Sequence, residues 1–106
     1  MPLQQRVVGD VADLFGVLAH PTRVKILSLL HEAEHDVSEL RDRLQVTATN
    51  VSQHLAILRA RSVVVGRREG NNVRYSIAEP AICELLDATR KIFERQVAAN
   101  SRLLDG

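Results

Sequence analysis

The segment covering residues 36–60 constrains the fold of this 106-residue chain more than any other. Its first part repeats apolar residues at i, i+3 and i+7, the spacing of one helical face: Val37, Leu40 and Leu44. A second helical repeat follows, with Thr47 placed as its N-cap: Val51, Leu55 and Leu58. The segment is therefore predicted to be a helix-turn-helix whose turn lies at Gln45 and Val46.

The outward face of the second predicted helix carries short, neutral side chains that form hydrogen bonds. At about 100° per residue, three residues lie farthest from the apolar repeat: Thr49, Gln53 and Ala56. A solvated helix usually carries Lys and Glu there, whereas amides and hydroxyls suit base edges in a major groove. His54 lies about 60° from the apolar repeat, so a packed imidazole and a phosphate contact are both open. The DNA-binding candidates on this helix are Thr47, Thr49, Asn50, Ser52, Gln53 and His54.

Length and composition bound the rest of the molecule. The chain is long enough for one domain, residues 1–106, and its 45% hydrophobic residues suffice for one core, which must be aliphatic because aromatics make up 3%. The single Cys83 cannot form an internal disulfide. There is no charged-then-apolar leader, and no apolar run approaches the roughly 18 residues of a membrane span. These features predict a cytoplasmic protein with no membrane partner.

The net charge of +1 is distributed unevenly along the chain. Between Arg41 and Arg74 there are seven arginines and two acidic residues, so this segment carries +5 and the remainder carries −4. A charge run is more often only a solvated face. Here it coincides with the predicted helix-turn-helix, as an electrostatic footprint for phosphate would.

Two further helices are predicted before the helix-turn-helix. Apolar residues between positions 3 and 18 form a helical stripe that two glycines interrupt. Pro21 follows His20 and suits the first turn of a new helix that extends to about Glu32. The apolar residues of this helix are expected to supply much of the core: Val24, Ile26, Leu27, Leu29 and Leu30.

After Ala60 the periodicity changes from helical to alternating. Two β-rich runs, Ser62–Arg67 and Val73–Ile77, flank Gly and Asn residues that tolerate positive φ, which predicts a β-hairpin wing over residues 62–77. Its apolar inner face is expected to comprise Val63, Val65, Val73, Tyr75 and Ile77. Protection of an edge strand is one explanation for the arginines near the tip. Contact with phosphate or a narrow minor groove is favoured, because the tip holds Arg and Asn but no Lys: Arg67, Arg68, Asn71, Asn72 and Arg74.

A long final helix is predicted over residues 80–104. Its apolar residues are spaced in threes and fours: Ile82, Leu85, Leu86, Ile92, Phe93, Val97, Leu103 and Leu104. Such a helix is too long for a core that three others already supply, so with the first helix it is predicted to pair with a second copy in a two-fold dimer. A lone helix packed along its own domain is the alternative. The candidate interface residues are Leu14, Leu85, Leu86, Ile92 and Phe93.

The fold class is therefore mainly α with a small β-hairpin, a winged helix-turn-helix of about five helices and a two-stranded wing. Four stretches carry a family resemblance: LAHPTRVKILSLL (18–30), VSELRDRL (37–44), TATNVSQHLAILRARSVV (47–64) and REGNNVRYSI (68–77). Together they resemble the ArsR/SmtB family of winged-helix repressors over nearly the whole chain. The resemblance implies a homodimer, joined through its first and last helices, that binds an inverted-repeat operator and is released by an inducer.

The resemblance does not extend to the family's metal-binding residues. Where similar metal sensors carry an ELCVCDL box, residues 34–40 read EHDVSEL, so Asp36 and Ser38 replace both thiolates. At the second family site only Glu79 could bind a metal among the corresponding positions Glu79, Ala81, Ile92 and Arg95. No metal and no cofactor are therefore expected at the usual sites, and the inducer is unidentified.

Three alternatives for regulation or function stay open. A non-standard metal site could use His31 and His35 with nearby carboxylates, and a thiol switch could use Cys83, although a lone cysteine is more often a small buried hydrophobe. The winged helix could instead be a protein-interaction module, against which the polar helix face and the arginine wing argue. No nucleophile, base and orienting group can be assembled, so no enzyme is predicted. We expect a sequence-specific DNA-binding transcriptional repressor.

Overall fold

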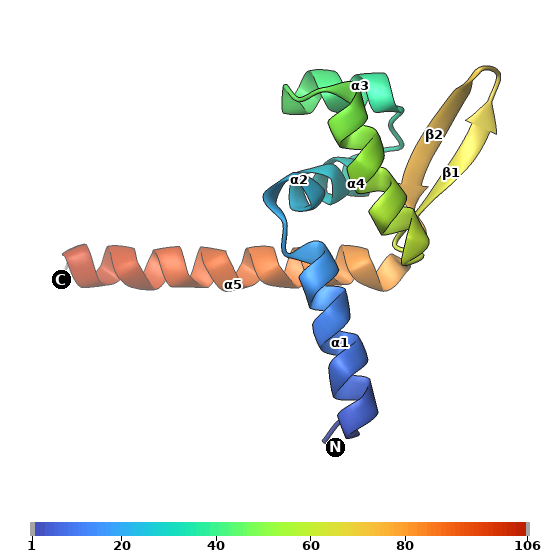
Figure 1. Cartoon of the computed structure of the whole chain (residues 1–106). Helices are drawn as coiled ribbons and strands as arrows, with labels where there is room; N and C mark the ends of the chain where they lie inside the picture. The colour runs from blue at the N-terminus through green and yellow to red at the C-terminus, as the bar shows by residue number, and fades with distance from the viewer. Residues whose placement is uncertain (1, 106) are drawn as a thin grey trace.

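The computed structural model describes residues 2–105, and within them it contains five helices and one hairpin. The elements are α1 (Gln5–Leu18), α2 (Pro21–Glu32), α3 (Val37–Leu44), α4 (Ala48–Ala60), β1 (Val64–Glu69), β2 (Asn72–Ile77) and α5 (Pro80–Asp105). Figure 1 shows α2, α3, α4 and the hairpin grouped along one side of α5, while α1 projects away on the other side. This arrangement confirms the predicted winged helix-turn-helix.

Local capping explains where the two helices of the helix-turn-helix begin and end. Asp36 and Glu39 form a capping box at the start of α3, in which each side chain accepts from the other's backbone N–H, at 2.8 Å and 3.3 Å. Gln45 ends α3 in the left-handed region, with φ of 57°. Thr47 Oγ1 accepts from the N–H of Asn50 at 3.0 Å and caps α4. The predicted turn and both helix boundaries are therefore confirmed.

The core lies between α2, α3, α4, the base of the hairpin and the start of α5. All three apolar repeat residues of α4 are buried, as predicted: Val51, Leu55 and Leu58. Of the five α2 residues expected in the core, Ile26, Leu27 and Leu30 are buried and Leu29 packs against them. The prediction for Val24 is wrong, because this side chain is 42% exposed and lines an open groove between α2 and α5.

The side chains of β1 do not lie on the faces of the hairpin that the sequence predicts. In the antiparallel register Val64 pairs with Ile77 and Gly66 with Tyr75, so these residues share one face of the sheet. Val65 is on the other face and 48% exposed, so its predicted place on the inner face is wrong. The cause is Ser62, whose φ of 59° turns the chain before the strand and lets both Val63 and Val64 be buried.

Gly66 is required by the packing inside the wing. A Cβ at this position would lie 2.8 Å from Cγ1 of Val73 and 3.2 Å from Cε1 of Tyr75. The Tyr75 ring therefore covers the space that a side chain at residue 66 would need. A side chain at residue 66 would therefore require Val73 to shift and the Tyr75 ring to move by a few tenths of an ångström.

The two terminal helices leave apolar surface uncovered within one copy of the chain. In α5 the residues near its start reach the core, with Ile82 buried and Leu86 packed against it. Farther along, Ile92, Phe93 and Val97 are exposed, and α1 has no buried residue. The expected contributions of Leu103 and Leu104 lie outside the described side chains, which end at residue 102. Although α5 has 26 residues, neither it nor any other described helix has an apolar stretch that could span a membrane.

Candidate nucleic-acid interface

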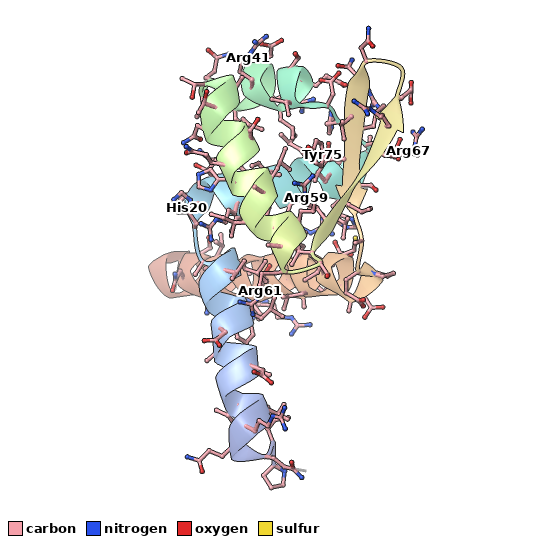
Figure 2. The ribbon with its side chains drawn as sticks, turned by 45° about the vertical axis from the view of Figure 1, so that its right-hand side comes forward. His20, Arg41, Arg59, Arg61, Arg67 and Tyr75 are labelled. Atoms are coloured by element: carbon pink, nitrogen blue, oxygen red, sulfur yellow. The ribbon has the colours of Figure 1, made fainter. Side chains whose placement is uncertain are left out.

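The outward face of α4 is a continuous, uncharged polar surface. Thr49, Ser52 and Gln53 are all exposed, and the buried residues of the same helix lie on its opposite side. None of these three side chains takes part in a hydrogen bond with another described residue. Arginines lie on the elements around this helix, and Figure 2 labels Arg41 on α3, Arg59 near the end of α4 and Arg67 on the wing. Such an arrangement can offer hydrogen bonds in the centre and positive charge at the periphery.

Asn50 differs from its neighbours on this face. Its side chain is half-buried, and its Oδ1 atom is buried without a hydrogen-bond partner among the described residues. A buried amide oxygen without a partner is costly. Asn50 therefore has only part of its amide available to an external partner, whereas the side chain of Gln53, three residues along the same helix, is exposed.

His54 is packed inside the protein, so its inclusion among the DNA-binding candidates needs correction. The residue is 9% exposed, and its ring lies 4.5 Å from that of His20. Its Nδ1 accepts a 3.1 Å hydrogen bond from Nε of Arg23, which also donates through Nη1 to the carbonyl of Val17 at 2.9 Å. Of the two environments left open by the sequence, the structure shows the packed one. His54 links α4 to α2 and, through Arg23, to α1.

Acidification is expected to weaken folding through His54. Burial, followed by the charges of His20 and Arg23, lowers the pKa of His54 below its ordinary value. The unfolded chain therefore binds more protons than the folded chain once the pH drops below about 6.5. The contribution of His54 to the free energy of unfolding is fully present above that pH and is lost progressively as the pH falls toward the lowered pKa.

A matched variant tests this dependence. In His54→Asn the amide oxygen replaces Nδ1 as the acceptor for Arg23, but the group does not titrate. Urea denaturation at about pH 7.5 and about pH 5.5 should show a smaller loss of stability for His54→Asn than for the unmodified protein. Equal losses in the two proteins would show that His54 does not cause the dependence.

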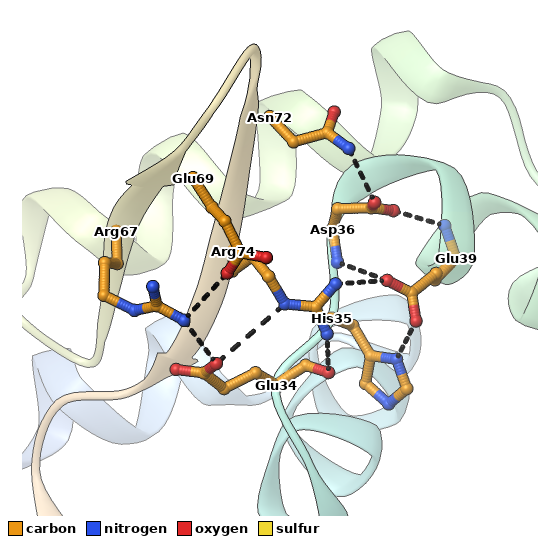
Figure 3. Close-up of polar contacts among 8 residues, drawn as sticks. All are labelled: Glu34, His35, Asp36, Glu39, Arg67, Glu69, Asn72 and Arg74. Carbon is orange, nitrogen blue, oxygen red and sulfur yellow. Dashed lines mark hydrogen bonds and ion pairs between the residues drawn. The ribbon is translucent and has the colours of Figure 1, made fainter.

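The wing arginines are engaged within the protein to different degrees. Arg74 donates to Glu39 Oε1 at 2.8 Å and to the carbonyl of Glu34 at 2.9 Å, and Arg67 donates to Glu34 Oε1 at 2.9 Å (Figure 3). The bond from Arg67 to Glu34 is the main cause of a raised pKa for Arg67. Arg68 has no ion pair with any described residue.

The polar residues at the wing tip also differ in their contacts. Asn72 donates to Asp36 Oδ2 at 3.3 Å, whereas Asn71 is exposed and forms no hydrogen bond with a described side chain. The two free groups at the tip are therefore Arg68 and Asn71 within the described chain. These contacts with residues 34–39 escaped the sequence analysis, although an acidic segment and an arginine-rich hairpin gave a charge signal for them.

The residues considered for metal or thiol chemistry lie apart. Nε2 of His31 is 3.1 Å from Asp87 of α5, and Nδ1 of His35 is 3.3 Å from Glu39. Within the described residues no three His, Cys, Asp or Glu side chains converge as metal ligands would. Cys83 is a free, half-buried cysteine in the first turns of α5.

The candidate interface residues on α1 and α5 form two groups. Leu14, Leu85 and Leu86 are half-buried, and Leu14 and Leu86 pack against the core of their own chain. Ile92 and Phe93 are 49% and 64% exposed. The second group is therefore more completely available to another copy than the first.

Comparison with known proteins gives a consistent result. Residues 20–64 match the family described as "Bacterial regulatory protein, arsR family". The chain is 42% identical over 95 residues to the uncharacterised HTH-type transcriptional regulator Rv0081 of Mycobacterium tuberculosis, covering 89% of this chain and 83% of that protein. It is 33% identical to the biofilm growth-associated repressor of Agrobacterium fabrum, covering 88% and 80%.

Solved structures extend the similarity to three dimensions. The crystal structure of M. tuberculosis Rv0081 superposes with a TM-score of 0.84 at 39% identity, covering 92% of this chain and 99% of that chain. The solution structure of the homodimeric winged helix-turn-helix DNA-binding domain of Mb0332 from Mycobacterium bovis gives a TM-score of 0.79 at 26% identity, covering 90% and 91%.

The fold and these similarities define a DNA-binding transcriptional repressor rather than an enzyme. The chain belongs to the ArsR family of bacterial regulatory proteins.

Proposed function

We propose that the protein acts in the cytoplasm as a homodimeric repressor that binds an inverted-repeat operator in double-stranded DNA. The observation that carries this proposal is the exposed, uncharged polar stripe of α4, formed by Thr49, Ser52 and Gln53. A helix of this kind fits a major groove, where amides and hydroxyls can pair with base edges. Thr47 would hold the start of the helix in place through its cap, with Asn50 contributing the accessible part of its amide.

The dimer supplies the second half of the operator contact. The exposed side chains of Ile92, Phe93 and Val97 on α5, together with Phe15 on α1, are apolar surface that a second copy would cover. The homodimeric state of the similar M. bovis domain supports this assembly. Two copies related by a two-fold axis would present their α4 helices to successive major grooves, which is why an inverted repeat is expected.

The wing would contribute contacts that depend little on sequence. Arg68 and Asn71 are exposed near its tip and can reach phosphates or a narrow minor groove. Arg67 and Asn72 are also exposed at this end, although both are held by carboxylates of residues 34 and 36. Arg68 is therefore the wing cation most accessible to DNA.

The releasing signal in this proposal is not a metal bound at the usual family sites. The segment that would hold thiolates instead contains Asp36 and Ser38, and Asp36 caps α3 through its contact with Glu39. A redox signal through Cys83 remains a second candidate, because the thiol is free and lies on the helix proposed to form the dimer.

Base reading and phosphate binding should be separable by mutation. Gln53→Ala is expected to reduce discrimination between an operator and a scrambled duplex by about 1 to 3 kcal/mol, because the amide can form two hydrogen bonds with adenine. Arg68→Ala is expected to weaken binding to both duplexes and to lower the salt slope by about one unit. Both variants should be measured over a salt series on an operator selected from a random-sequence duplex library.

The two variants control for each other, because each removes one exposed side chain. If Gln53→Ala leaves the ratio of affinities unchanged, the outward face of α4 does not read bases. If the library yields no preferred sequence and the protein does not bind nonspecific DNA at low salt, the winged helix is a protein-interaction module.

A further inference from the structure

We propose that Arg74 is a positioning residue that holds the wing at a fixed orientation to α4, and that its partners are Glu34 and Glu39. This inference rests on the proposed DNA-binding function and revises the role that the sequence suggested for Arg74. Arg74 would act on operator affinity through the wing, without binding a phosphate itself.

The contacts of Arg74 use both edges of its guanidinium group. Nη1 donates to Glu39 Oε1 at 2.8 Å, Nη2 donates to the backbone carbonyl of Glu34 at 2.9 Å, and Nε lies 3.9 Å from Glu34 Oε1. The side chain is 27% exposed, compared with 57% for Arg67. These contacts direct the guanidinium group toward residues 34 and 39 and leave it less accessible to a phosphate than that of Arg67.

The pairing of the strands explains why a carboxylate is needed here. Arg67 and Arg74 are direct partners in the hairpin register, so two like charges face each other across the sheet. Such a pair is destabilising on its own. Glu34 Oε1 lies 2.9 Å from Nη2 of Arg67 and 3.9 Å from Nε of Arg74, so this one carboxylate reduces the repulsion between the two arginines (Figure 3).

Further bonds fasten the connection between α2 and α3 to the same strand. The backbone N–H of His35 donates to the carbonyl of Tyr75 at 3.2 Å, and the N–H of Tyr75 donates to the carbonyl of His35 at 2.8 Å. Asn72 donates to Asp36 at 3.3 Å. His35 therefore forms an isolated antiparallel bridge with Tyr75 at the β2 edge of the wing.

Glu39 connects these contacts between residues 34–36 and β2 to the helix-turn-helix. The same Oε1 atom accepts from the backbone N–H of Asp36 in the capping box and from Arg74 on the wing. The pKa of the Glu39 carboxyl is lowered, first by the Asp36 N–H bond and further by Arg74 and His35. Because α3 packs directly against α4, a shift of the wing at Arg74 would change its position relative to the recognition surface.

The direction in which Glu39→Gln changes the affinity for DNA tests the proposal. Glutamine preserves the capping box but loses the charge that attracts Arg74. If Arg74 positions the wing, operator affinity should fall about tenfold, the loss typical of weakening a hydrogen bond to a charged group. If Arg74 instead binds phosphate, the variant frees it, and binding to operator and scrambled duplexes should both become tighter.

Asp42→Asn is the matched control. Asp42 is on the same helix, but its side chain pairs with Arg41 at 3.2 Å and contacts no residue of the wing. Removing this negative charge should leave operator binding unchanged or slightly tighter, through the general electrostatic attraction of DNA. If Glu39→Gln behaves like Asp42→Asn, the positioning role is overturned, while operator binding by the unmodified protein still supports the proposed function.

Substitutions at Arg74 test its role independently of Glu39, through the operator affinity and its salt dependence. Arg74→Ala should weaken operator binding with a salt slope equal to that of the unmodified protein, whereas Arg68→Ala should lower the slope by about one unit. Arg74→Lys should not restore affinity, because an ammonium cannot reproduce the planar contacts to residues 34 and 39. A lowered salt slope for Arg74→Ala, or full rescue by lysine, would show that Arg74 contacts phosphate. Circular dichroism would confirm that each variant is folded.

Discussion

Phe93→Glu is expected to give a folded monomer that no longer binds its operator with high affinity. Phe93 is 64% exposed within one chain, so a carboxylate there costs little in the isolated copy. In the proposed dimer the same carboxylate would be buried without a partner in each copy, at a cost of several kcal/mol. A loss of about 3 kcal/mol raises the dissociation constant of the dimer more than 100-fold. Sedimentation equilibrium and operator titration would measure both effects.

Lys91→Glu is a suitable control for this variant. It places the same carboxylate on α5, with a larger change in net charge, at a position about 160° around the helix from Phe93. The control should remain dimeric. Leu86 is less informative, because it packs against the core of its own chain and Leu86→Glu would damage folding as well as assembly. A dimeric Phe93→Glu protein that binds its operator would refute the proposed interface.

Leu58→Ala is expected to lower the free energy of unfolding by about 2 to 5 kcal/mol. Leu58 is 0% exposed and belongs to the buried side of α4, where few neighbouring groups can move to fill the space. Ile57→Ala, on the adjacent and partly exposed position of the same helix, should cost about 1 kcal/mol. Urea denaturation at one fixed protein concentration would compare the two, since a dimer's stability depends on concentration. Equal losses would mean that the buried side of α4 has been misplaced.

The parts of the fold that could be predicted have signals close together in sequence. Thr47, an N-cap residue, marks the start of α4 directly after the turn, and the apolar repeat of α4 gives its buried side directly. The predicted boundaries of the hairpin strands were close to the observed ones. The predicted alternation of side chains between the two faces was wrong, because positive φ at Ser62 is not expected from a serine. That single turn moved Val65 to the exposed face.

The site was predicted less completely, because its internal contacts join residues that are distant in sequence. Arg74 and Glu39 are 35 residues apart, and Arg23 and His54 are 31 apart. No periodicity connects such pairs. Residue type indicated that an arginine or a histidine near DNA could bind phosphate, but only the folded arrangement shows which of them already has a partner inside the protein.

The division of α4 into two sides has a consequence for how regulators of this kind can diverge. The side chains of Thr49, Ser52 and Gln53 are exposed and form no hydrogen bond with a described residue, whereas Val51, Leu55 and Leu58 are buried in the core. In the proposed DNA complex, substitutions at the first three positions would therefore change which operators are bound without lowering the fraction of folded protein. A duplicated copy of the chain could acquire a new set of target genes through a few such changes, each compatible with the same scaffold.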